Sequence, residues 1–255
     1  MKIIYLDCFS GISGDMFLGA MADMCVNFST LSSGLAMLDI EGLSLKSRRT
    51  HKSGIACMKV DVVVPDTKEE RHLSDILDIL EKSGLEPDIK KTSRAIFRRL
   101  ATAESKVHGI PVEEVHFHEV GALDTIADVV GAAICYKDSG AQALYSSPVN
   151  VGGGFVKTAH GMLPVPAPAT LELLKGIPVY SSGVHAELVT PTGAAILAEL
   201  CSNFGPMPHM KVEYTGYGAG TKDLETPNLL RASLGELIAG APSAPNTEIH
   251  AGHHH

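Results

Sequence analysis

The chain has 255 residues and a formal net charge of −8, and a chain of that length buries enough apolar surface to fold without disulfides or a structural metal. Its acidity disfavours attraction to nucleic-acid phosphates, and its lack of tryptophan disfavours base stacking. No apolar run approaches the roughly 20 residues that a membrane-spanning helix needs. We therefore expect neither nucleic acid nor a membrane as a partner.

The five cysteines are scattered and form no CxxC pair, and the opening residues are too few and too soon interrupted for a secretion signal. These features predict a reduced, cytoplasmic protein. Residues 238–255 are rich in alanine, proline and polar residues and end in three histidines, which is typical of a linker followed by a tag. We therefore expect one ordered domain over residues 1–237 and leave the terminal histidines out of every functional argument.

Apolar spacing and turn residues predict the following elements in chain order. They are a strand at 2–6, a helix from 14, a β-hairpin over 43–64 that turns at 52–54, helices at 73–80, 89–105 and 125–136, a strand near 143–149, helices at 169–175 and from 191, and a second hairpin from 211–217 and 229–234. The helix at 125–136 is apolar almost all round, so we expect it to be central. The alternation predicts an α/β domain, with α+β as the alternative, in which helices flank a mixed β-sheet with antiparallel hairpins.

The segment 107–128 holds the densest cluster of possible metal ligands. His116 and His118 are two residues apart, which directs both imidazoles to one side of an extended strand, and Glu119, Asp124 and Asp128 follow. Imidazole with carboxylate suits divalent nickel, zinc or iron, and ligand type alone does not separate them. The structural alternative is that the histidines bond a buried turn while the aspartates cap a helix.

The opening loop is a second candidate site. Asp7 follows the first strand, and Gly11, Ser13 and Gly14 lead to Asp15 at the start of a helix. A carboxylate, glycines and a helix N-terminus together are where α/β proteins bind phosphates and their metals. The loop lacks the Gly-Lys-Ser/Thr ending of a P-loop. A tight strand-to-helix connection is the structural alternative.

A glycine triplet forms a third candidate site. Gly152, Gly153 and Gly154 allow backbone N–H groups to approach an anion, with Lys157 and His160 nearby to supply charge and proton transfer. From spacing alone, the triplet is equally consistent with a flexible turn between strands.

A fourth candidate site is another helix start. Thr190 is a plausible N-cap before Pro191, which makes Thr190 and Thr192 candidates for binding an anion.

Three long stretches together resemble the LarC family of nickel-insertion proteins: YLDCFSGISGDM, VHFHEVGALDTIADVVG, and the region from SPVNVGGG to ELVTPTGAAIL. The resemblance runs from Met1 to about Leu237. It implies insertion of Ni(II) into pyridinium-3,5-bisthiocarboxylic acid mononucleotide in a reaction that consumes CTP. The product would be the nickel pincer nucleotide used by lactate racemase, and the enzyme would be a nickel cyclometallase of the lyase class.

The sequence departs from the family pattern in two ways. Family members continue into a C-terminal domain that would bind CTP with Mg²⁺ or Mn²⁺, which implies that the present chain is the N-terminal part and that its partner is that domain. Many members also carry a histidine-rich run where this chain has residues 66–70, so no nickel-storage role is transferred. A homo-oligomer is a further possibility that the sequence leaves open.

The resemblance suggests how these residues divide the chemistry. We expect His116 and His118, with Glu119 or Asp124, to hold nickel, while His160 or another imidazole accepts the proton that leaves the substrate ring. The metal-ligand set extends to Asp7, Asp15 and Asp128, and His118 is also a candidate catalytic residue. The residues expected to contact the phosphate are Gly11, Ser13, Gly14, Gly152, Gly153, Gly154, Lys157, Thr190 and Thr192.

Two other functions remain open. The chain could be a nickel delivery or docking module without catalysis of its own, or a metal-dependent phosphoester hydrolase. The whole nickel-insertion hypothesis assumes that folding gathers Asp7, the paired histidines and the glycine triplet into one pocket.

Overall fold

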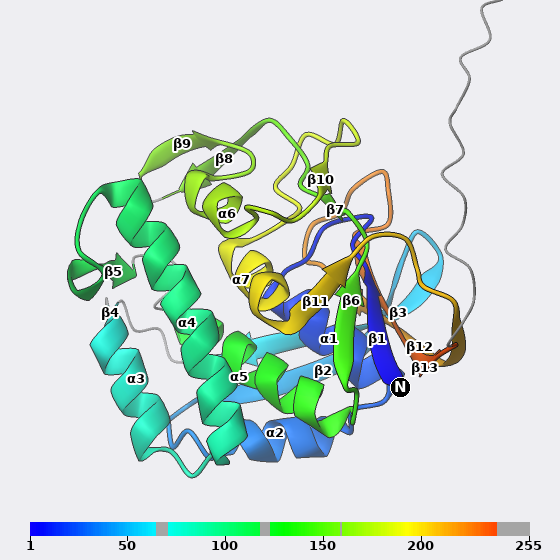
Figure 1. Cartoon of the computed structure of the whole chain (residues 1–255), viewed down its shortest axis with the longest axis horizontal. Helices are drawn as coiled ribbons and strands as arrows, with labels where there is room; N and C mark the ends of the chain where they lie inside the picture. Colours follow the sequence, from blue (N-terminus) through cyan, green and yellow to red (C-terminus); the bar gives the residue numbers. More distant parts are fainter. Residues whose placement is uncertain (65–70, 118–122, 159, 239–255) are drawn as a thin grey trace, which may run out of the picture.

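A computed structural model of the chain describes residues 1–64, 71–117, 123–158 and 160–238, apart from the side chain of His116. Its centre is a seven-stranded sheet with the strand order β11-β6-β1-β13-β12-β3-β2, so β11 and β2 form the edges (Figure 1). The strands are β1 (Lys2–Asp7), β2 (Ser44–Lys52), β3 (Ile55–Val63), β6 (Ala143–Ser146), β11 (Cys201–Phe204), β12 (Met210–Ala219) and β13 (Leu229–Leu237).

Helices pack against the sheet and against one another. They are α1 (Gly14–Met24), α2 (Phe28–Ala36), α3 (Leu73–Lys82), α4 (Pro87–His108), α5 (Leu123–Asp138), α6 (Pro168–Leu173) and α7 (Pro191–Leu200), with a 3-10 turn at Val112–Glu114. Helix α1 lies on β12, β3 and β13, α5 packs on α1, and α4 packs on α5. Three two-stranded ribbons pair β4 (Arg71–His72) with β5 (His116–Phe117), β7 (Val149–Asn150) with β10 (Val179–Tyr180), and β8 (Phe155–Thr158) with β9 (Gly161–Pro164).

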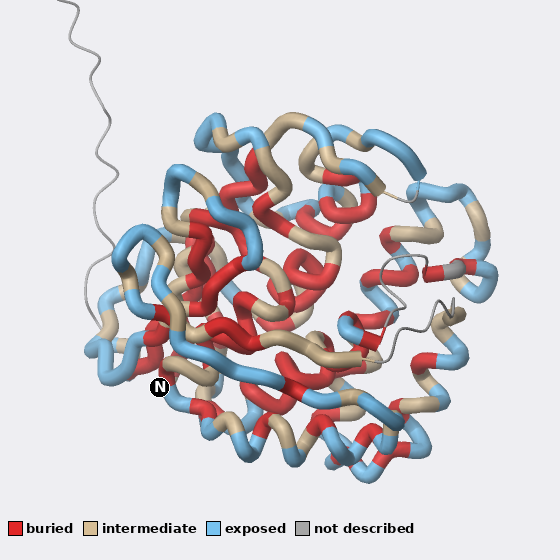
Figure 2. The backbone as a smooth tube through the Cα atoms, turned by 180° about the vertical axis from the view of Figure 1, so that it is seen from behind, coloured by how far each residue is buried: buried red, intermediate tan, exposed pale blue. Residues whose placement is uncertain are grey.

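The sheet is mixed, as predicted. Strand β1 runs parallel to β6 and antiparallel to β13, β11 runs parallel to β6, and the pairs β2–β3 and β12–β13 are antiparallel. The α/β class and the antiparallel pairs are thereby confirmed. Helix α5 is buried along nearly its whole length, which confirms its central place. Figure 2 shows the buried backbone concentrated in the inner strands and helices, with exposed segments around them.

The loop before α1 is joined to the segment before α7 by two backbone hydrogen bonds. Ile12 N–H donates to the Leu188 carbonyl at 2.9 Å, and Thr190 N–H donates to the Ile12 carbonyl at 3.2 Å. A side chain at Gly11 or Gly193 would overlap the backbone of the opposite segment, so both positions require glycine. Thr190 caps α7 by accepting from Gly193 N–H, as its sequence predicted. The N-termini of α1 and α7 are therefore fixed side by side.

Three features differ from the sequence-based expectation. The predicted strand at 143–149 is two short strands, β6 and β7, which are separated by Ser147 and Pro148 and pair with different partners: β6 with β1 and β11, and β7 with β10. Pro148 has no N–H to continue the pairing. The β8–β9 hairpin was not predicted; it follows the glycine triplet, which itself lies between the strands β7 and β8. Helix α2 was not predicted because its sequence is rich in serine; it is capped by Asn27 and buries Leu31 and Leu35.

No helix in the described ranges is both long enough and apolar enough to span a bilayer. The predicted tail, residues 238–255, lies outside the described part except for Ile238. The division into an ordered domain and a tail therefore stays a prediction.

The close approach of α1 to β12 depends on Gly218, where a Cβ atom would overlap the Met16 carbonyl oxygen of α1. We expect Gly218→Ala to lower the free energy of unfolding by about 3 kcal/mol, because a backbone contact cannot move aside as a flexible side chain can. The matched control is Thr215→Ala on the exposed part of the same strand, with an expected cost below about 1 kcal/mol. Chemical denaturation of both variants tests this, and equal costs would contradict the packing argument.

Candidate functional site

The N-termini of α1, α5 and α7 meet around a cavity of about 300 Å³, here called the carboxylate cavity. Its lining residues are Ser13, Gly14, Asp15, Lys59, Val60, Asp61, Val62, Asp124, Thr125, Asp128, Thr190, Thr192 and Thr221. A smaller cavity of about 150 Å³ shares Ser13, Asp15, Thr190 and Thr221 with it and extends to Lys222 and Asn228. The two form one site along the start of α1.

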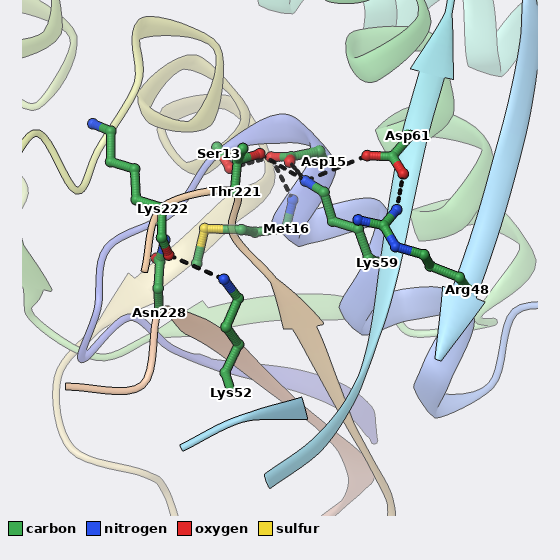
Figure 3. Close-up of polar contacts among 10 residues, drawn as sticks. All are labelled: Ser13, Asp15, Met16, Arg48, Lys52, Lys59, Asp61, Thr221, Lys222 and Asn228. Atoms are coloured by element: carbon green, nitrogen blue, oxygen red, sulfur yellow. Dashed lines mark hydrogen bonds and ion pairs between the residues drawn. The ribbon is translucent and has the colours of Figure 1, made fainter. Parts of the chain in front are cut away.

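A buried ion pair joins α1 to β3 inside this site. The Lys59 ammonium donates to Asp15 Oδ2 and, at 3.0 Å, to Thr221 Oγ1, while Asp61 Oδ1 lies 3.9 Å away (Figure 3). Only 5 % of the Lys59 side chain is exposed, so these oxygens replace the water that would otherwise stabilise its charge. Asp15 Oδ1 in turn accepts from Ser13 Oγ and from Met16 N–H. The Asp15 carboxylate is therefore held in one orientation at the helix start.

Asp128 lies half-buried on α5 beside the start of α1. Burial raises its pKa well above the usual aspartate range, the charges of Asp15 and Asp124 raise it further, and Lys59 opposes the shift. Its buried Oδ1 has no hydrogen-bond partner among the described residues. A side chain at Gly14 would overlap the Asp128 carboxyl, so this contact requires glycine. Asp128 therefore stays a neutral acid over a wider pH range than an ordinary aspartate.

The lining combines two opposite electrostatic features. Helix N-termini favour anions through their free N–H groups and dipoles. Asp15, Asp61 and Asp124 instead favour a cation, and together they outnumber the one lysine that lines the cavity. A divalent cation that bridges one or two carboxylates and a phosphate satisfies both features. Within the described ranges, no three His, Cys, Asp or Glu side chains are grouped so that they could hold a metal ion by themselves.

A second depression, here called the histidine cleft, has a volume of about 350 Å³. It is lined by Glu104, Val107, His108, Thr158, His160, Leu163, Ala167, Pro168, Ala169 and Pro191. The His108 and His160 rings have centroids 4.8 Å apart, and Glu104 Oε2 lies 3.4 Å from His108 Nε2. His160 lies at the tip of the β8–β9 hairpin, where its N–H donates to Thr158 Oγ1 at 3.1 Å.

Seven of the predicted site residues line the carboxylate cavity together. They are Ser13, Gly14, Asp15, Asp124, Asp128, Thr190 and Thr192. Sequence reasoning placed them in three separate segments, and the meeting of three helix starts joins them. Their predicted chemical roles stay predictions.

The glycine triplet differs from the expectation, because Gly152, Gly153 and Gly154 do not line the carboxylate cavity. They lie against residues 181–188 instead, and a Cβ atom at Gly152 would overlap the Ala186 carbonyl oxygen. The N–H of Gly153 donates to that same carbonyl at 3.2 Å, and the N–H of Gly152 donates to Asn150 Oδ1 at 3.2 Å. These glycines therefore serve close backbone packing here, and two of their N–H groups already have acceptors within the chain.

Other predicted residues also lie elsewhere. Asp7 does not line the carboxylate cavity but forms an ion pair with Arg231 on β13. Gly11 packs on Leu188, and Lys157 is exposed on β8. His160 lines the histidine cleft, whose lining includes no other predicted site residue.

The paired imidazoles fall largely outside the described structure. His118 and Glu119 lie outside the described residues, and of His116 only the backbone, which pairs with His72, is described. The predicted single pocket is therefore not found among the described residues. Asp7 and the glycine triplet lie outside the carboxylate cavity, and the side chains of the paired histidines are not described.

Sequence reasoning missed Lys59, Thr221 and His108. A lysine among valines in a predicted strand gave no indication of burial, yet the Lys59 ammonium turns to Asp15 at the start of α1 and to Thr221, and the residue is buried. The signal available was the run Lys59–Val62, in which charged and apolar residues alternate. His108 lies in the ligand-rich segment 107–128 but was not singled out, because its partner His160 is far away in the sequence.

The fold and the carboxylate cavity define an α/β protein that places charged groups at the starts of three helices. The chain belongs to the nickel insertion protein family, whose sequence model matches residues 4–252.

Curated relatives agree with this assignment. A protein of Desulfitobacterium hafniense strain DCB-2 named pyridinium-3,5-bisthiocarboxylic acid mononucleotide nickel insertion protein is 53% identical over 93% of this chain and 59% of its own length. A protein of the same name from Geobacillus kaustophilus is 45% identical over 96% of this chain and 62% of its own length. The chain thus spans about three fifths of the length of these relatives. No solved structure matches it significantly.

The raised pKa of Asp128 predicts a pH-dependent stability. Between the ordinary aspartate pKa and the raised one, the folded protein keeps a proton that the unfolded chain has lost. Stability therefore falls as pH rises, by at most about 1.4 kcal/mol per pH unit. Asp128→Asn cannot ionise, so we expect its gain in stability over the native chain to grow with pH through this window and then level off.

The measurement is the free energy of unfolding against pH in the presence of a metal chelator. Asp124→Asn, at an exposed carboxylate of the same cavity, is the control and should show a smaller gain. A gain from Asp128→Asn that does not change with pH would show that the acid is ionised in the folded protein.

Proposed function

We propose that this chain takes part in inserting nickel into pyridinium-3,5-bisthiocarboxylic acid mononucleotide during synthesis of the nickel pincer nucleotide used by lactate racemase. The observation that carries the proposal is the similarity of nearly the whole chain to relatives whose names state this substrate. The reaction would make the protein a nickel cyclometallase of the lyase class, acting in the cytoplasm. CTP with Mg²⁺ or Mn²⁺ would bind a C-terminal domain of the kind that family members carry.

The carboxylate cavity suits the phosphate end of that substrate. Ser13 and Gly14 at the start of α1 and Thr190 and Thr192 at the start of α7 would surround the phosphate, and Lys59 adds a buried positive charge. A divalent cation would bind there to the phosphate and to one or two of the carboxylates of Asp15, Asp124 and Asp128. The unpartnered Oδ1 of Asp128 supports this role, because an approaching cation would supply the partner that the described residues lack.

The insertion itself needs a metal-holding group and a base. We assign His116 and His118, with Glu119 or Asp124, to the incoming nickel, and His160 or another imidazole to the proton. In the insertion step the ring C–H bond breaks, its electron pair forms the carbon–nickel bond, the proton passes to the His160 imidazole, and nickel remains divalent. The remaining predicted ligands of metal or phosphate keep those roles as proposals: Asp7, Gly11, Gly152, Gly153, Gly154 and Lys157.

The experiment that tests the function is calorimetric titration of the chain with nickel and, separately, with the pyridinium nucleotide, followed by mass spectrometry of a mixture of both. Binding of both ligands supports the insertion function. Binding of nickel without the nucleotide would instead identify a delivery or docking module. Formation of the nickel nucleotide only after CTP is added with the remainder of a full-length relative would locate catalysis between the two parts.

We expect the double variant His116→Ala/His118→Ala to weaken nickel binding by more than about tenfold, because losing direct ligands costs more than losing the groups that orient them. All variants are made in a chain whose histidines at 250 and 253–255 are replaced by alanine, so that the tail does not bind the metal. His51→Ala/His209→Ala, which removes two exposed histidines, is the matched control. Unchanged nickel affinity in the first double variant would refute the ligand assignment.

A further inference from the structure

We propose that the histidine cleft binds the flat heteroaromatic ring of the nucleotide while the carboxylate cavity binds its phosphate, so that one substrate molecule lies across the start of α7. This inference rests on the proposed function and specifies which surface holds which end of the substrate. It also brings His108 and Glu104 into the site, two residues that sequence reasoning did not select.

The linings of the two cavities differ in polarity, and each suits a different end of the substrate. The walls of the histidine cleft are mainly apolar, with Leu163, Ala167 and Pro191 among them, and its volume of about 350 Å³ falls in the range of small-molecule pockets. Apart from two valines, the carboxylate cavity is lined by glycine and by polar and charged side chains. A flat ring gains by leaving water for apolar walls, whereas a phosphate needs N–H groups and charge.

The two cavities are adjacent at the first turn of α7. Pro191 lines the histidine cleft, while its sequence neighbours Thr190 and Thr192 line the carboxylate cavity. Consecutive Cα atoms are about 3.8 Å apart. One turn of α7 therefore lines both cavities, and a ribose lying across this turn would connect a ring on one side with a phosphate on the other.

The polar groups of the cleft suit a cationic ring that must lose a proton. Glu104 offers a negative charge to a pyridinium ring, and its carboxylate also lies beside His108. His108 and His160 place two imidazoles at one site, one at the end of α4 and the other at the hairpin tip. Ring binding in this cleft would thus bring the reacting carbon to the residue already assigned to the proton.

The β8–β9 hairpin offers a matched pair of variants. Leu163 lines the cleft, and Met162, its neighbour on the same strand, points to the other face and is 63 % exposed. Leu163→Trp should fill the cleft, and Met162→Trp should add the same bulk to solvent. The probes are pyridinium-3,5-dicarboxylic acid mononucleotide, which is the oxygen analogue of the substrate, and 1-methylpyridinium-3,5-dicarboxylate, which has the ring without ribose or phosphate.

We expect Leu163→Trp to weaken calorimetric binding of the nucleotide analogue by about tenfold or more and Met162→Trp to leave it unchanged. In the native chain, the ring probe alone should shift the NMR signals of the His108 and His160 ring C–H groups, which tests the site without any variant. Thermal unfolding of both tryptophan variants confirms that each is folded.

The outcomes separate this inference from the function on which it rests. If the native chain binds the nucleotide analogue, yet Leu163→Trp binds it equally well and the two histidine signals do not move, the ring lies elsewhere and the proposed function stands. If the native chain binds neither probe, both the proposed substrate and the ring site are wrong.

Discussion

Two backbone hydrogen bonds, from Ile12 to Leu188 and from Thr190 to Ile12, fix the geometry on which the candidate site depends. They join segments that are far apart in the sequence and leave no room for side chains at Gly11 and Gly193. The starts of α1 and α7 are thereby held together, and α5 adds a third helix start through the contact of Asp128 with Gly14. The cavity is a consequence of this backbone arrangement, and its side chains only determine its charge.

The carboxylate cavity holds several acidic groups close enough to repel one another when they are ionised. Several carboxylates and one buried ammonium share a small volume, and the described structure resolves this by pairing Lys59 with Asp15 and by favouring the neutral form of Asp128. Such a cavity favours binding of a further cation, because a bound cation lowers the repulsion among the carboxylates. A divalent cation and a phosphate that enter together would fit this combination of carboxylates and helix N-termini better than either would alone.

Much of the fold could be predicted from sequence because its signals are local. The apolar run of β1, the cap of α7 at Thr190 and the all-round apolar pattern of α5 each depend on neighbouring residues. Helix α2 and the β8–β9 hairpin lacked such signals. Seven lining residues of the carboxylate cavity were predicted individually but not as one site, since they come together only through tertiary contacts. Lys59 shows the limit most clearly, because its buried ammonium contacts Asp15 and Thr221, which lie far from it in the sequence and which no spacing rule within the strand contains.

The edge strand β2 has a consequence for how copies of this protein meet. An unpaired strand edge is a template on which a second chain can add by backbone hydrogen bonding. Lys46, Arg48 and Arg49 are exposed along this edge of an otherwise acidic molecule. Arg48 pairs with Asp61 and Arg49 with Asp23, so this edge presents charged side chains and ion pairs where an apolar edge would present a flat surface. Such an edge makes sheet extension between copies less favourable.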